Sequence, residues 1–151
     1  MIDEQKPKTL AEKITELEQR RADRKKANDA KRDAQLVSDL EAIEELEIEL
    51  GEGSIAIVEI PEHTPGCVTL VAARAPNSAE VKRYRFMASD KPGKRNEVIP
   101  GDAVGAAEQL AETCLKYPDA EAFEKVCAER PGLKAQLGTF AVQLVLGKAK
   151  S

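Results

Sequence analysis

The chain has 151 residues and a formal net charge of −4, which leaves room for one or two small domains. Aromatic residues make up only 3%, so a core must be built from leucine, valine, isoleucine and alanine. The acidic balance disfavours a nucleic-acid-binding domain, and no apolar run approaches the ~18 residues needed to span a bilayer.

The cysteines and the first residues indicate in which cellular compartment the protein is expected. The three cysteines are an odd number without the spacing of a disulfide scaffold, and the first residues lack the apolar core of a signal peptide. We therefore expect a soluble cytoplasmic protein, with no membrane partner.

A long helix is predicted over residues 9–50, which contain no proline or glycine. Thr9 followed by Glu12 has the spacing of a capping box, and Gly51 and Gly53 end the segment. Large apolar residues are missing from 18–35, which interrupts any continuous coiled coil. They recur on either side at helical spacing: Leu10, Ile14 and Leu17, then Leu36, Leu40, Ile43, Leu46 and Leu50. We expect an arm anchored at its C-terminal third, either solvated along the rest of its length or used to grasp a partner or another copy.

Charge divides this helix into two parts. Residues 1–32 hold ten Lys/Arg against seven Asp/Glu, whereas residues 33–62 hold ten Asp/Glu and no Lys/Arg. The basic charges of the arm include Arg20, Arg21, Arg24, Lys25 and Lys26. They are interpreted as a solvated face, as a contact for an acidic protein surface such as that of a neighbouring copy, or as a contact for phosphates. No aromatic residues interleave with them, so stacking on single-stranded nucleic acid is not supported.

The rest of the chain predicts a small α+β domain over 53–151. Two β-branched runs around a proline-containing turn predict a hairpin at 54–74. Helices are expected at about 77–88, 102–116, 119–130 and 133–146, and residues 90–102 are expected to form a loop because they hold two prolines and two glycines. The predicted fold class is α+β, mainly α, with a long N-terminal helix, a β-hairpin and a C-terminal helical bundle.

The residues that could carry chemistry do not form a recognisable site. His63 is the single histidine, and Cys67 is four residues away, but a metal site would need Cys114 and Cys127 folded onto that pair. The glycines lack the lysine of a phosphate-binding loop. We therefore predict no enzyme, no catalytic residues, no metal and no cofactor.

From residue 76 onward, a predicted helix ending in a Tyr-Pro pair is followed by an acidic-aromatic helix, a Pro-Gly turn and a short apolar helix. The positions that define this order are Tyr117, Pro118, Phe123, Pro131, Gly132, Leu133, Leu144 and Gly147. This order of elements resembles that of the tail assembly chaperones of long-tailed phages. The resemblance covers about half of the chain, and the charged helix at 9–50 departs from it.

This resemblance implies a non-enzymatic protein that binds the tape measure and tail tube proteins during morphogenesis in the host cytoplasm. An exposed apolar groove between helices would hold the partner. The apolar positions expected to contribute are Leu110, Phe123, Leu137, Phe140 and Leu144. The alternative is a virion structural protein, such as a head, decoration or tail component, whose helical arm grips neighbouring subunits. A nucleic-acid-associated regulator that uses the basic segment is a third, less favoured class.

Overall fold

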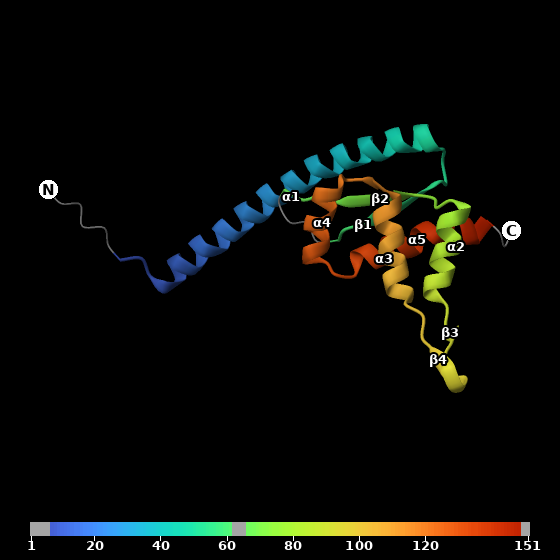
Figure 1. Ribbon diagram of the computed structural model, residues 1–151. Helices are drawn as coiled ribbons and strands as arrows, with labels where there is room; N and C mark the ends of the chain where they lie inside the picture. The colour runs from blue at the N-terminus through green and yellow to red at the C-terminus, as the bar shows by residue number, and fades with distance from the viewer. Residues whose placement is uncertain (1–6, 62–65, 149–151) are drawn as a thin grey trace.

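The computed structural model describes residues 7–61 and 66–148. It has the predicted α+β, mainly α architecture, with a long N-terminal helix, a small antiparallel sheet and a group of C-terminal helices. Figure 1 shows the first half of the N-terminal helix standing away from a body that holds all the other elements, except for a hairpin that projects from its lower end.

The N-terminal helix α1 spans Leu10–Leu50. Its first turn is closed by the predicted capping box, in which Thr9 and Glu12 each accept a hydrogen bond from the other's backbone N–H. Gly51 ends it with a positive φ of 96°, a conformation that residues with a Cβ rarely adopt.

The sheet has three antiparallel strands in the order β1-β2-β5. Strands β1 (Ile55–Glu59) and β2 (Leu70–Arg74) form the predicted hairpin, with Ile57 opposite Ala72. The third strand, β5 (Leu115–Tyr117), was predicted to be the last turn of a helix. That prediction was wrong because Leu115 leaves the helical conformation and pairs with Ala73, while Tyr117 pairs with Ala72.

Besides β5, seven elements follow β2 among the described residues. Helices α2 (Ser78–Ala88) and α3 (Ala103–Cys114) are joined by a hairpin of β3 (Lys91–Pro92), the 3-10 turn η1 (Lys94–Asn96) and β4 (Val98–Ile99). The two short strands pair where only a loop was expected. Helices α4 (Ala120–Glu129) and α5 (Leu133–Lys148) complete the chain, and Asn77, Asp102 and Asp119 cap α2, α3 and α4.

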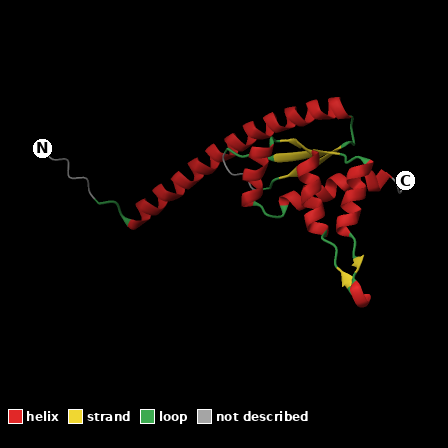
Figure 2. Ribbon diagram, in the orientation of Figure 1, coloured by secondary structure: helices red, strands yellow, loops and turns green. Residues whose placement is uncertain are grey.

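The sheet is the middle of three layers, as Figure 2 shows, because its side chains alternate between two apolar clusters. On one face, Ile55, Leu70 and Ala72 pack with Ile43 of α1. On the other face, Val58 and Val71 pack with residues of α3, α4 and α5, including Leu110, Phe123 and Leu137. The second half of α1 is therefore packed onto the sheet, and only its first half is a free arm.

Polar contacts join the helices at the margins of this core. Lys134 of α5 donates to Glu112 of α3 and to Glu124 of α4, each at 2.7 Å. Arg74 at the end of β2 makes a two-pronged contact with Glu80 of α2, at 2.7 and 2.9 Å, and this hydrogen bonding lowers the pKa of Glu80. These contacts join α5 to α3 and α4, and the end of β2 to α2.

Candidate functional site

Strand β1 presents one free edge of the sheet among the described residues. The N–H of Ala75 donates to the carbonyl of Ser54, and the N–H of Ile60 donates to the carbonyl of Thr69. These two bonds show that the even-numbered residues of β1 bond to β2. Since bonded residues alternate along an antiparallel pair, the backbone groups of Ile55, Ile57 and Glu59 are directed outward. Such an edge can accept a further strand.

An apolar groove runs beside this edge, between β1 and α5. It is lined by Ile55, Ala56, Ile57, Phe140, Gln143 and Leu144. Ile57 and Phe140 are 37% and 39% exposed, whereas their neighbours Val58 and Leu137 are buried. The groove thus combines outward backbone hydrogen-bonding groups with exposed apolar side chains, which suits an extended peptide segment.

The five residues predicted to bind a partner fall into two groups. Leu110, Phe123 and Leu137 are 4%, 1% and 0% exposed, because they form the core between the sheet and α3, α4 and α5. Their side chains therefore leave almost no surface for a partner. Phe140 and Leu144 remain accessible and lie together in the groove beside β1. The edge of β1 could be recognised in sequence as a hairpin edge, but which helix lies beside it could not.

A buried carboxylate attaches α1 to the sheet. Asp39 is 0% exposed and accepts hydrogen bonds from the backbone N–H and the hydroxyl of Thr69, both at 2.6 Å. It also accepts from the amide of Gln35 at 2.8 Å and from the hydroxyl of Tyr117. The cluster joins α1, the residue before β2 and the end of β5, so it holds the base of the arm in place. Sequence reasoning could not identify this cluster, since a carboxylate in a charged helix is normally solvated.

Tyr117 makes this attachment sensitive to alkaline pH. Burial first, and then the hydrogen bond and negative charge of Asp39, raise the pKa of Tyr117 above its ordinary value. The unfolded chain therefore loses the phenol proton at a lower pH than the folded chain. The contribution of the neutral phenol to folding stability is fully present below about pH 10. It is lost as the pH rises toward the raised pKa of Tyr117 in the folded chain.

We predict that the urea midpoint falls more steeply between about pH 9 and pH 11 in the wild type than in Tyr117→Phe. The phenylalanine variant lacks the titrating hydroxyl but keeps the ring. Other groups, including the Cys114 thiol whose pKa burial raises to about 11, titrate alike in both proteins. Equal slopes in the two proteins would show that the Tyr117 hydroxyl does not couple folding to pH.

The structure does not assemble the cysteines into a site. Cys114 is buried under the sheet and Cys127 is half-buried on α4, and burial raises the pKa of both thiols. His63 lies outside the described residues. Among the residues that are described, no group of three histidine, cysteine, aspartate or glutamate side chains is placed to hold a metal ion.

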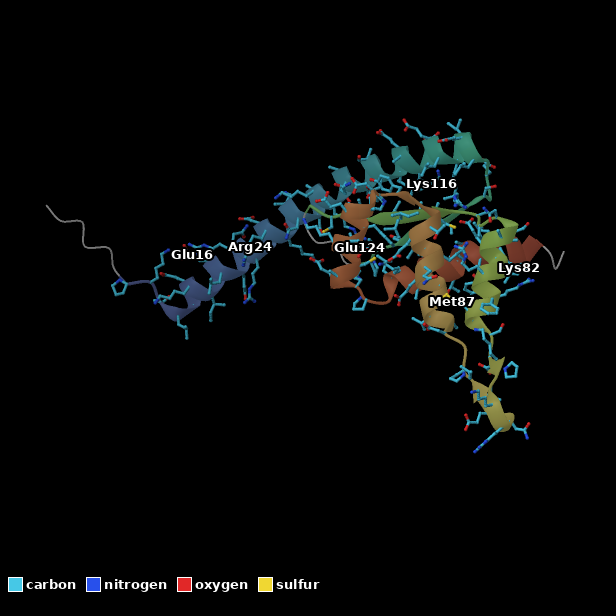
Figure 3. The ribbon with its side chains drawn as sticks, in the orientation of Figure 1. Glu16, Arg24, Lys82, Met87, Lys116 and Glu124 are labelled. Atoms are coloured by element: carbon cyan, nitrogen blue, oxygen red, sulfur yellow. The ribbon has the colours of Figure 1, made fainter. Side chains whose placement is uncertain are left out.

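The charged arm is exposed along its projecting part. The basic residues Arg20, Arg21, Arg24, Lys25 and Lys26 are all exposed, and Figure 3 shows Arg24 and Glu16 on the segment that stands away from the body. One ion pair joins Arg20 to Glu16 at 3.5 Å, and another joins Lys8 to Glu16 at 2.7 Å. Exposed pairs of this kind contribute little stability. The basic side chains are accessible because they are exposed.

Comparisons with protein-family models, with curated proteins and with solved structures find no match to this chain. Within residues 7–61 and 66–148, none of the helices combines the length and apolar character that crossing a bilayer requires.

Proposed function

We propose that this chain is a non-enzymatic, phage tail assembly chaperone-like protein that binds the tape measure and tail tube proteins during morphogenesis. The sequence resemblance over the C-terminal half is the reason for naming this class. The structural observation that supports a binding role is the groove between β1 and α5, where Ile57 and Phe140 are exposed next to the outward backbone of the strand.

The proposed mode of binding is the addition of an extended apolar segment to β1. The outward N–H and C=O groups of Ile55, Ile57 and Glu59 would bond to its backbone. Side chains of the segment that point toward α5 would rest on Phe140 and Leu144. Covering an apolar segment in this way would keep it from aggregating until assembly.

The test is binding of peptides that tile any tape measure and tail tube proteins found in the genome that encodes this chain, measured by fluorescence anisotropy. We expect Phe140→Asp to weaken binding at least about tenfold, because a carboxylate cannot be buried unpaired against an apolar segment. Phe86→Asp is the matched control, since Phe86 is 67% exposed on α2 and lies outside the groove. Unchanged binding by Phe140→Asp would exclude the groove, and no binding by any peptide would count against the proposed function.

The alternative is a virion structural protein, and the free arm of α1 favours it. Leu10, Ile14 and Leu17 are 75%, 47% and 53% exposed along one side of that arm, as would suit a contact with a neighbouring subunit. Quantitative mass spectrometry of purified particles separates the two functions. A chaperone is absent from finished particles, whereas a stoichiometric amount would replace our proposal with the structural alternative.

A further inference from the structure

One side of the free arm is both apolar and basic. Because an α-helix turns by about 100° per residue, Arg21, Arg24 and Lys25 lie on the same side as the exposed Leu10, Ile14 and Leu17. Three acidic residues of the arm, Glu12, Glu16 and Asp23, fall on the other side, and Glu18 and Asp29 lie at the margin of the first side. We call the first side the arm face.

The outer side of the second half of α1 has the opposite character. Val37, Leu40 and Ile48 are 56%, 51% and 79% exposed there. The exposed carboxylates Asp33, Glu41 and Glu44 lie among them. This outer face lies away from the sheet, since the buried Asp39 and Ile43 point to the opposite side. Leu40, expected in sequence to anchor the helix, belongs to the outer face.

The two faces are similar in length and opposite in charge. The exposed arm from residue 10 to 31 is about 33 Å long, and residues 33–50 extend over about 27 Å. Each carries three exposed apolar residues, and one has basic flanks where the other has acidic flanks. Opposite charges across a contact steer partners together and disfavour mismatched ones.

We propose that the arm face of one copy of this chain docks on the outer face of α1 in a second copy. The two faces lie about 160° apart around the helix axis, counting about 100° per residue. A single pair of copies therefore cannot dock both arms reciprocally along one contact. The result is a head-to-tail contact that leaves one arm and one outer face free, so that further copies add. This inference does not depend on the proposed function, because it needs no phage partner.

The test is sedimentation velocity of the full chain over a range of concentrations. We expect assemblies that grow with concentration and dissociate when ionic strength rises from about 0.1 M to about 1 M, where the Debye length falls from roughly 10 Å to 3 Å. A wild type that stays monomeric at the lower ionic strength overturns the proposal. A dimer that does not grow with concentration overturns the head-to-tail arrangement.

A charge swap tests the two faces directly. We expect Arg21→Glu with Lys25→Glu to abolish association, and Glu41→Lys with Glu44→Lys to do the same. Mixing the two double variants should restore association, because each then offers a face complementary to the other. All four positions are exposed, so the urea midpoints should stay close to that of the wild type.

The matched control reverses the charge of two exposed lysines outside both faces, with Lys82→Glu on α2 and Lys125→Glu on α4. This variant should associate as the wild type does. If this control loses association to the same extent, the loss is due to net charge and not to the two faces. If the mixed double variants fail to associate, pairing between the two faces is excluded.

Discussion

Asp39→Ala is expected to lower the free energy of unfolding by about 3 kcal/mol. The carboxylate of Asp39 is fully buried and accepts two hydrogen bonds from Thr69 and one from Tyr117. Its removal leaves the N–H and hydroxyl of Thr69 buried beneath α1 without their acceptor. An unsatisfied buried donor costs about 1–3 kcal/mol, so these two donors account for most of the effect.

Urea unfolding followed by circular dichroism measures this loss, and Asp33→Ala is its control. Asp33 lies on the same helix and is exposed, so its replacement should change stability by less than about 0.5 kcal/mol. Hydrogen exchange adds a local readout, because residues 36–50 of α1 should lose protection in Asp39→Ala before the body of the protein does. If the two variants unfold at the same urea concentration, the Asp39 cluster does not hold α1 to the sheet.

Asp39 also shows where sequence reasoning about α1 stops. The helix and its capping box follow from local patterns, as does the anchoring of its C-terminal third, and the structure has all three. The side of the helix that faces the sheet was predicted only in part. Leu40 is 51% exposed, and Asp39 takes the inward position next to it. The partners that make this possible, Thr69 and Tyr117, lie 30 and 78 residues away, so no local pattern reveals them.

The same limit applies to the groove. An apolar residue that closes the core and one that lines a groove look alike in sequence. Phe123 is 1% exposed and Phe140 is 39% exposed, although both occur among apolar residues of the C-terminal helices. The difference lies in tertiary packing, because Phe123 joins the core cluster against the sheet whereas Phe140 lines the groove beside β1.

Gly138→Ala is expected to lower the free energy of unfolding by about 2 kcal/mol. Gly138 lies in α5 where it crosses α3, and a Cβ there would overlap the backbone carbonyl oxygen of Ala107. Forcing an extra methyl group into a packed core costs about 1–3 kcal/mol, and a contact with backbone can be relieved only by moving a helix. The higher helix propensity of alanine offsets up to about 1 kcal/mol of this cost.

Gly132→Ala is the matched control, because a Cβ at Gly132 would meet nothing within 4 Å. We expect its thermal unfolding midpoint to equal or exceed that of the wild type, whereas the midpoint of Gly138→Ala should fall. Adding Ala107→Gly to Gly138→Ala should not restore stability, since the overlap is with the backbone carbonyl rather than the side chain of Ala107. A Gly138→Ala protein as stable as the wild type would show that α3 and α5 are free to separate.

Because Phe140 lies two residues further along α5, the same separation would shift one wall of the groove beside β1. The close crossing at Gly138 therefore sets the position of Phe140 relative to the strand edge.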